Sequence, residues 1–187
     1  NLMHDALHNT VTRNEWVNRK IGAAIYMLCG NSYTWRVQHN MKHHTHTNLD
    51  GHDDDIETGN LFRFHPDQER KSYHRFQHFY APFTYSLMTW KWLLQKDFVQ
   101  VMDYGNSDLF KARDQSLGMV WTKLIIGKTV HIGTFYVLPM LLGAPWYMVL
   151  WGNVLMHMMA GFILSITFQL AHVVDKAEFP KEKEVKE

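Results

Sequence analysis

The sequence predicts an all-α protein in which integral membrane helices adjoin a cytosolic helical region rich in histidine, together forming part of a larger domain. Two observations carry this prediction. Residues 147–171 are apolar, with one histidine and no formal charge, and about 20 such residues cross the hydrocarbon layer of a bilayer. The chain also holds 13 histidines, and some of them are spaced four residues apart, which places them on one face of a helix.

The polar half of the chain divides into two helical parts. Residues 1–60 are histidine-rich and contain a helical pattern over 14–29. Residues 61–120 mix aromatic with basic side chains, which predicts interfacial or cytosolic helices. Within them, residues 76–94 are strongly aromatic and interrupted by Pro82, a pattern that indicates a kinked or interfacial helix rather than a clean membrane span.

A helical hairpin that crosses the membrane is predicted over residues 124–171. Its first span is 124–146, where Lys128 lies close enough to the start to extend to the membrane interface. Gly143-Ala144-Pro145 predicts a tight turn, and residues 147–171 form the second span. The alternative is a buried hairpin in a soluble helical protein, which would not partition into detergent.

The distribution of charge orients the hairpin. The loop between the spans carries no Lys or Arg, whereas the flanking sequences carry Lys111, Arg113, Lys123, Lys176, Lys181 and Lys183. The positive-inside rule therefore places both outer ends, including residues 172–187, in the cytoplasm. We expect a protein of the bacterial inner membrane or the endoplasmic reticulum, with its histidines at the cytoplasmic face.

Overall composition excludes some classes of function. A net charge of +1 creates no field that would attract nucleic acid, so no nucleic-acid partner is expected. Cys29 is the only cysteine, which excludes an intrachain disulfide framework and, on the sequence alone, any cysteine-based zinc site. The 14% aromatic content and 11 methionines suit a membrane or a lipid pocket.

Two histidine motifs are the candidate metal ligands. In His4-Asp5-Ala6-Leu7-His8 the imidazoles are four residues apart, so on a helix both approach one metal centre. The segment from His39 to His44 repeats this spacing with His43 and adds His44. His44 is turned by about 100° from His43 on a helix, so it can serve a second metal ion. A lone HxxxH pair is weak evidence, because structural pairs are common; the two motifs together are stronger.

The residues around the motifs narrow the choice of metal without fixing it. A zinc protease of the H-E-x-x-H type has Glu after its first histidine, whereas here Asp5 follows His4 and the spacing is HxxxH. Soluble di-iron bundles use Glu with Glu-x-x-His, where this chain offers histidines. Imidazole suits Fe, Zn and Cu alike.

The chain resembles the membrane fatty-acid desaturases, which carry HDxxH and then HxxxHH followed by Thr-Asn and an acidic stretch. The matching segments are residues 4–8, 39–44 and 47–56, and the likeness extends to 75–78 and 168–174. It is nearest to the front-end branch and its linoleoyl-CoA-desaturase-like relatives. The family's third box, a Gln or His followed by an HH pair, and the spans expected before the first box do not occur in the chain, so we expect this part alone to bind iron poorly and to be inactive.

This resemblance implies two iron ions held mainly by histidines at the cytosolic face. It also implies O₂ as co-substrate, a fatty acyl substrate as acyl-CoA or acyl-lipid, an electron donor of the cytochrome b5 or ferredoxin type, and contact with membrane lipid. A hydroxylase or ketolase of the same superfamily is a rival that the sequence does not exclude. A membrane protein whose histidines bind zinc without catalysis is another.

His172 is a further candidate ligand. Two spans separate it from the second box, so it returns to the face on which the boxes lie, and it matches a region where the family supplies an additional ligand. The alternative is a helix-end histidine at the lipid headgroups. Asp5, Asp53 and Asp55 could orient the N–H groups of the ligands, or, for the last two, could be solvated acids in a loop.

Other residues are left outside the predicted centre. Seven histidines have weaker spacing or surroundings, and those inside the spans are interpreted as neutral side chains hydrogen-bonded between helices. They are His46, His52, His65, His74, His78, His131 and His157. Four tryptophans, Trp35, Trp90, Trp92 and Trp121, could line an acyl tunnel or form an interfacial belt.

Overall fold

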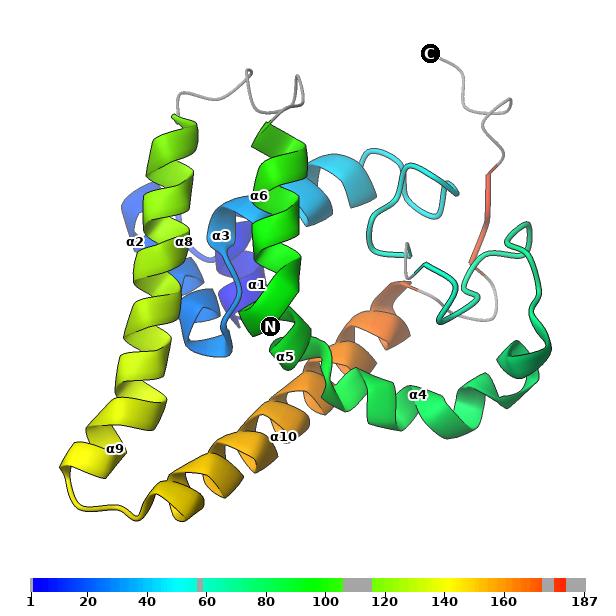
Figure 1. Ribbon diagram of the computed structural model, residues 1–187. Helices are drawn as coiled ribbons and strands as arrows, with labels where there is room; N and C mark the ends of the chain where they lie inside the picture. Colours follow the sequence, from blue (N-terminus) through cyan, green and yellow to red (C-terminus); the bar gives the residue numbers. More distant parts are fainter. Residues whose placement is uncertain (1, 57–58, 106–115, 173–176, 181–187) are drawn as a thin grey trace.

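The computed structural model describes residues 2–56, 59–105, 116–172 and 177–180, with the backbone alone for 170–172. All regular secondary structure in these ranges is helical, which confirms the predicted all-α class for the described part of the chain. Figure 1 shows a long helical hairpin, with shorter helices between and beside its arms.

The N-terminal segments place the first two histidine motifs. They are α1 Leu2–Leu7, α2 Glu15–Gly22, the 3₁₀ segment η1 Ala23–Leu28, α3 Ser32–Trp35 and the π-helix η2 Arg36–His43. The side chains of Asn14 and Asn31 accept hydrogen bonds from the first backbone N–H groups of α2 and α3, which is why these helices begin where they do.

The middle of the chain forms a broken series of helices: η3 Ser72–Phe76, α4 Gln77–Ser86, α5 Met88–Lys91, the π-helix η4 Trp92–Lys96 and α6 Asp97–Gly105. Pro82 lies inside α4, which continues past it and ends at Ser86. The proline removes the N–H that would bond to the carbonyl four residues back, and the kinked or interfacial character expected for 76–94 stays a prediction.

The hairpin consists of α8 Leu117–Ile132, η5 Gly133–Val137, α9 Leu138–Leu141 and α10 Trp146–His172. The first arm begins at Leu117 rather than at 124, because the Ser116 side chain caps it by accepting from the Met119 N–H. It also ends earlier than predicted, at Leu141, before Gly143 turns the chain with φ +95°. The second arm agrees with the prediction to within one residue at each end.

Both arms are long and apolar enough to cross a membrane, over Leu117–Leu141 and Trp146–Gln169. Within the most apolar 18-residue stretch of each arm, only 22% and 28% of the residues are buried in the protein. Large side chains such as Leu142, Trp151 and Leu155 are exposed. A hairpin in the core of a soluble protein would be covered on most sides. This exposed apolar surface therefore speaks against the soluble alternative.

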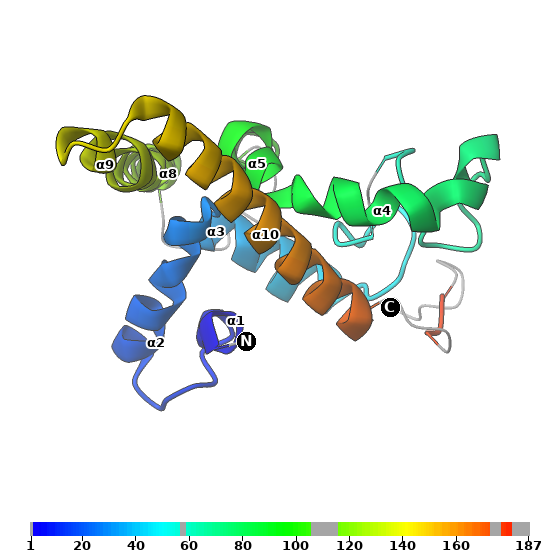
Figure 2. The same ribbon diagram turned by 90° about the horizontal axis from the view of Figure 1, so that it is seen from below.

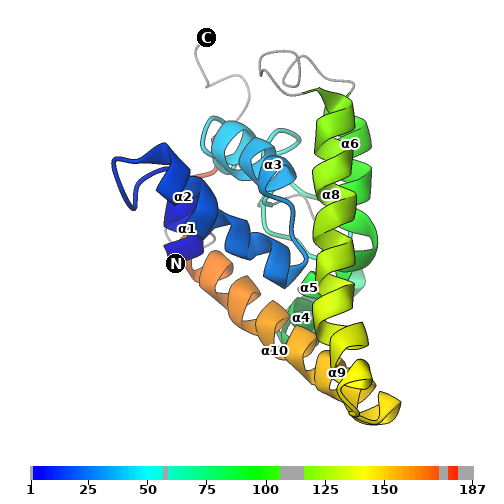
Figure 3. The ribbon, with the colours of Figure 1, turned by 90° about the vertical axis from the view of Figure 1, so that its left-hand side faces the viewer.

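The shorter helices pack against both arms of the hairpin. α10 lies along α4 and α5, which it crosses in Figure 2. α8 contacts η1 and α6, and Figure 3 shows α1, α2 and α3 beside α8 with α10 below them. One core cluster joins Val37, Val101 and Leu124, and a second joins Leu7, Trp35 and Trp92. The histidine segments are thereby fixed against the end of α10.

Lys128 does not extend to the interface as expected. Its ammonium is buried and donates to the carboxylate of Asp97 at 2.7 Å and to the carbonyls of Trp92 and Cys29. The Asp97 carboxylate accepts a further bond from Thr34 at 3.0 Å. A partner carboxylate inside the protein thus replaces the water that snorkelling would have supplied.

Candidate metal centre

The first histidine motif is built on α1. His4 lies within the helix, and His8 follows its last residue while its N–H still bonds to the His4 carbonyl at 3.1 Å. This one turn brings the two imidazole rings to a centroid separation of 4.6 Å. The predicted shared face of the HxxxH pair is therefore present in the structure.

The second motif lies in η2, a π-helix rather than the α-helix that the spacing suggested. In a π-helix each N–H bonds to the carbonyl five residues earlier rather than four, and the His44 N–H bonds in this way to the His39 carbonyl. His39 and His43 still share a face, and their rings stack with centroids 5.1 Å apart and an interplanar angle of 11°. π-turns of this kind occur frequently at functional sites.

The two motifs meet. Nε2 of His4 lies 3.1 Å from Nε2 of His39 and 3.3 Å from Nε2 of His8. Ligand atoms of all three residues lie within 4.8 Å of one another. Nitrogens that bind one tetrahedral ion at about 2.0–2.1 Å stand roughly 3.3 Å apart, so these rings fit a single metal ion.

Carboxylates hold the outer ring nitrogens of these histidines. Nδ1 of His39 donates to Asp55 at 2.7 Å, and Nδ1 of His43 donates to Asp53 at 2.9 Å. Nδ1 of His4 donates to Asp5 at 3.0 Å. With Nδ1 protonated, a neutral imidazole presents the lone pair of its Nε2, which is the arrangement found around metal-ligating histidines. Nε2 of His4 and Nε2 of His39 lie close enough to share either a proton or a metal ion.

Asp53 and Asp55 are therefore not solvated loop acids. Asp53 is fully buried and also accepts from the backbone N–H groups of Asn48 and Asp55. Asp55 accepts from the Gln38 amide as well. Between them, Asp54 accepts from Tyr104 at 2.6 Å and from Lys42 at 2.7 Å. These contacts fold the acidic loop back onto η2.

The ionisation of the cluster also suits a cation. Burial, followed by the nearby charges of His4, His39 and His44, lowers the pKa of His8 to about 4, so its lone pair is free at neutral pH. Burial, the largest single effect, would raise the pKa of Asp55, but the hydrogen bond from His39 and the charges of His39, His43 and Lys96 together lower that pKa to about 2. Burial would likewise lower the pKa of His43, yet the hydrogen bond to Asp53 and the charges of Asp55 and Asp53 together raise it.

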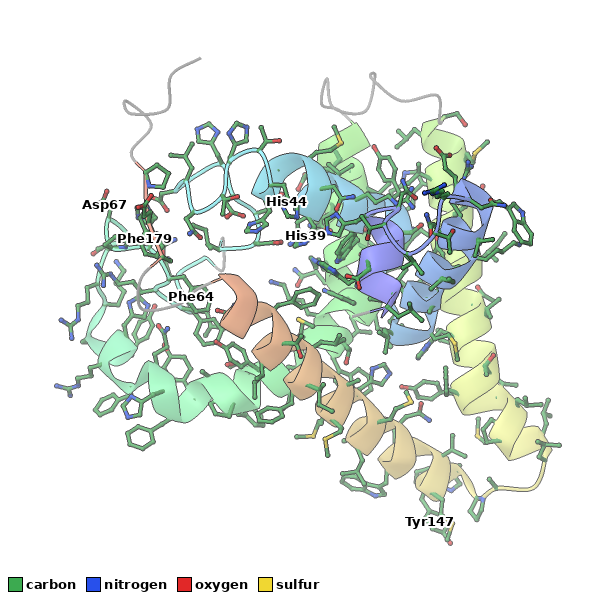
Figure 4. The ribbon with its side chains drawn as sticks, turned by 180° about the vertical axis from the view of Figure 1, so that it is seen from behind. His39, His44, Phe64, Asp67, Tyr147 and Phe179 are labelled. Carbon is green, nitrogen blue, oxygen red and sulfur yellow. The ribbon has the colours of Figure 1, made fainter. Side chains whose placement is uncertain are left out.

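Two predicted ligands, His44 and His172, are not part of the three-histidine group found among the described residues. His44 is exposed, and its ring lies 5.0 Å from that of His8 and 4.8 Å from that of His39, at the edge of the cluster. Figure 4 shows His39 and His44 at the opposite end of α10 from Tyr147, which marks the hairpin turn. His172 is the last residue of α10, but its side chain lies outside the described atoms, so its role remains a prediction.

A cavity of about 230 Å³ opens beside His39. Its walls combine residues of the histidine region with aromatic and apolar side chains from five helical segments: Trp35 of α3, Tyr85 of α4, Met88 of α5, Trp92 of η4 and Phe168 of α10. The Phe168 ring lies 6.2 Å from the rings of both His4 and His39. The cavity thus places His39, one of the three converging histidines, beside apolar side chains. Sequence reasoning did not identify Phe168 as a residue of this cavity.

The four tryptophans separate in the structure. Trp35 and Trp92 line this cavity, while Trp90 lies against His157 and Trp121 against Phe98.

The remaining histidines lie outside this cluster. The ring centroids of His46 and His52 lie 5.4 Å apart, and the ring of His65 packs on Phe179. His74 bonds to the Asn60 carbonyl. His78 is exposed beside Phe79. His131 and His157 are hydrogen-bonded between segments as expected. However, they share a second cluster with Cys29. Cys29 was considered from the sequence only for a cysteine-based zinc site, and its spacing along the chain did not indicate this grouping with two histidines.

A family model described as fatty acid desaturase matches residues 1–183. The chain belongs to the fatty acid desaturase family. This confirms the resemblance that was carried by the two histidine motifs and the acidic stretch after them.

Individual relatives agree with this assignment. The chain is 31% identical to an sn-1 linoleoyl-lipid 6-desaturase of Arthrospira platensis and 34% identical to that of Synechocystis sp., with 96% of this chain covered in each case and 48% and 49% of the relatives. It is 30% identical to acyl-lipid (8-3)-desaturase B of Dictyostelium discoideum, covering 98% of this chain and 39% of that protein. The chain spans about half the length of the first two relatives. No solved structure matches it.

Proposed function

We propose that the protein is an O₂-dependent di-iron desaturase that introduces a double bond into a long fatty acyl chain. The observation that carries this proposal is the convergence of His4, His8 and His39 nitrogens beside an apolar cavity. Membership of the desaturase family supports the same reaction class.

Six histidines are proposed to hold the two iron ions: His4, His8, His39, His43, His44 and His172. When bound, the iron pair supplies the oxidising power of the reaction, drawing on O₂ and on a donor of the cytochrome b5 or ferredoxin type. The protein's own contribution is positioning. Asp53 and Asp55 keep Nδ1 of His43 and His39 protonated, so that the opposite nitrogens are available to metal.

The cavity is proposed to hold the acyl chain. Trp92, Met88 and Phe168 supply an apolar wall that excludes water, and Phe168 stands between this wall and the histidine rings. The relatives named above act on linoleoyl-lipid or acyl-lipid substrates, which favours an acyl chain carried by a membrane lipid over an acyl-CoA.

The membrane placement belongs to the same proposal. α8 to α9 and α10 would cross the bilayer, with their exposed apolar side chains facing lipid. The histidine cluster lies at the end of α10 away from the hairpin turn. The turn carries no Lys or Arg, which by the positive-inside rule supports a proposed position of the cluster at the cytoplasmic face of a bacterial inner membrane or of the endoplasmic reticulum.

The test uses the full-length protein in detergent, with its iron content and its lipid products measured together. His8→Ala and His39→Ala should lose iron and the alkene product, while His78→Ala, an exposed histidine outside the cluster, should keep both. An oxygenated product would instead indicate a hydroxylase or ketolase. Zinc at full occupancy, with no iron-dependent activity, would indicate a non-catalytic metal-binding protein and overturn the proposal.

A further inference from the structure

A second cluster of metal-binding side chains lies apart from the iron centre, between the hairpin and η1. Cys29 ends η1, His131 is on α8 and His157 is on α10. Sγ of the cysteine and a ring nitrogen of each histidine lie within 4.8 Å of one another. The three residues are 1%, 2% and 2% exposed. Three segments that are distant in the sequence thus bring soft ligand atoms into one buried place.

Hydrogen bonds fix which nitrogen of each ring is protonated. Nδ1 of His131 lies 3.0 Å from the Met27 carbonyl, which can only accept, so this nitrogen carries the proton. Nδ1 of His157 lies 3.1 Å from the Thr89 hydroxyl. That hydroxyl already donates to the His157 carbonyl at 2.9 Å, so it accepts from Nδ1. Each ring therefore keeps Nε2 as its unprotonated nitrogen, with a lone pair available to a ligand.

These lone pairs are not satisfied by the part of the chain that the structure describes. Nε2 of His131 and Nε2 of His157 are buried and have no hydrogen-bond partner among the described residues. The Cys29 thiol has a single hydrogen, which can serve only one of them. A buried acceptor left without a donor destabilises the fold, because it has lost its water and gained nothing in exchange. The cluster therefore requires a further donor or a cation.

We propose that Cys29, His131 and His157 bind a soft metal ion, copper(I), as a structural site separate from the iron centre. One thiolate with two imidazoles is a donor set that selects copper or zinc. The thiolate cancels the charge of copper(I), whereas zinc would leave a net positive charge in an apolar place, which is costly. Copper(I) also accepts three ligands, while zinc sites are almost always four-coordinate.

Binding exchanges a proton for the metal. Burial raises the pKa of the Cys29 thiol to about 12, so the metal-free protein holds S–H. On binding, the S–H bond breaks, the sulfur–copper bond forms and the proton leaves to solvent, with no change in oxidation state. Lys128 donates to the Cys29 carbonyl and so fixes the backbone that carries the thiol. Ligand atoms of one ion stand about 3.3–3.8 Å apart, which requires only small movements of the rings.

The consequence is a link between the hairpin and the histidine region. η1 leads into α3 and η2, which carries the second histidine motif, whereas His131 and His157 are on the two arms of the hairpin. A metal ion held by all three would join these parts of the fold.

The experiment titrates the purified full-length protein with copper(I) under anaerobic, reducing conditions and then measures copper and iron by elemental analysis. Wild-type protein should retain stoichiometric copper after desalting and unfold at a higher temperature than before. Cys29→Ala and His157→Ala should lose both effects and keep their iron. His78→Ala is the matched control and should behave as wild type.

X-ray absorption at the copper edge covers the case in which a variant fails to fold, because it needs only wild-type protein. One sulfur and two nitrogen neighbours are expected. A copper ion without a sulfur neighbour, or a wild-type protein that holds iron but retains no copper, would overturn the proposal and leave a buried water as the donor. Neither result bears on the desaturase reaction, which rests on other histidines.

Discussion

The buried carboxylate of Asp53 accepts a hydrogen bond from Nδ1 of His43 at 2.9 Å, and this contact ties the acidic loop to the second histidine motif. Both oxygens of Asp53 also accept from backbone N–H groups, of Asn48 and Asp55. The side chain therefore serves the loop and the histidine together. Its role depends on having two acceptor oxygens, which an amide of the same shape lacks.

Asp53→Asn should weaken iron binding by about 10–100-fold, the range typical for loss of a residue that orients a metal ligand. The amide NH₂ would face an N–H donor, so His43 would lose its fixed orientation. Iron titration of the metal-free full-length protein measures this. Asp50→Asn is the control, because Asp50 is an exposed acid in the same loop that accepts from the Gln68 amide. Equal affinities for the two variants would contradict the assigned role.

The ion pair of Lys128 with Asp97 leads to a prediction about stability. Both side chains are buried, so Lys128→Met would leave an unpaired carboxylate, at a cost of about 3–5 kcal/mol. The double variant Lys128→Met/Asp97→Leu removes both charges and should recover most of this loss. Thermal unfolding in detergent measures the difference. If the double variant were no more stable than the single one, the buried pairing would be refuted.

The sequence predicted what depends on local spacing. Residues four apart on one turn share a face, so the approach of His4 to His8 and of His39 to His43 followed from the motifs alone. The long apolar helix α10 also followed, because an uncharged stretch of this length is typical of a continuous helix. These inferences needed no knowledge of how the chain folds back on itself.

What the sequence could not predict depends on contacts between distant segments. Lys128 was expected to reach the interface, because the sequence does not reveal that it pairs with Asp97. Asp97 lies on another helix, 31 residues away in the chain. The acids at 53 and 55 were ambiguous until the loop was seen to fold onto η2. Cys29 looked isolated because His131 and His157 approach it only through tertiary packing. The sequence did give a signal for His131, His157 and Lys128, since an ionisable residue inside a predicted span suggests a specific partner or a function.

Gly161 permits the close crossing of α10 with the end of α4. A Cβ atom there would lie 2.7 Å from the Ser86 carbonyl oxygen and 2.9 Å from that of Tyr85, and backbone cannot yield as a flexible side chain does. Gly161→Ala should therefore destabilise the protein and lower its unfolding temperature, despite the better helix propensity of alanine.

Gly152 provides the matched control for this crossing, because it lies on the same helix and a Cβ atom added there would meet nothing within 4 Å. Gly152→Ala should be neutral or stabilising by up to about 1 kcal/mol. Thermal unfolding of both variants under identical conditions makes the comparison. Similar behaviour of the two would mean that α10 and α4 do not approach closely in the membrane.

Ser165 tests whether the cavity holds the acyl chain. It is a buried, small residue of the cavity wall, and its hydroxyl contacts the Tyr85 carbonyl at 3.3 Å and the Met88 sulfur at 3.2 Å. Ser165→Leu would fill part of the cavity without touching a histidine. It should shift the product distribution toward shorter acyl chains and reduce turnover of long ones, while the iron content stays at the wild-type level.

Thr167→Leu is the control for added bulk, because Thr167 lies on the exposed side of the same helix and donates to the Ile163 carbonyl. Lipid products of both full-length variants, analysed by chain length, provide the measurement. Ser165 and Thr167 are two residues apart on α10, but one is buried in the cavity wall and the other is exposed, so only the first substitution should affect the cavity. An unchanged chain-length profile in Ser165→Leu, with normal iron content, would show that the substrate enters the histidine centre by a route other than this cavity.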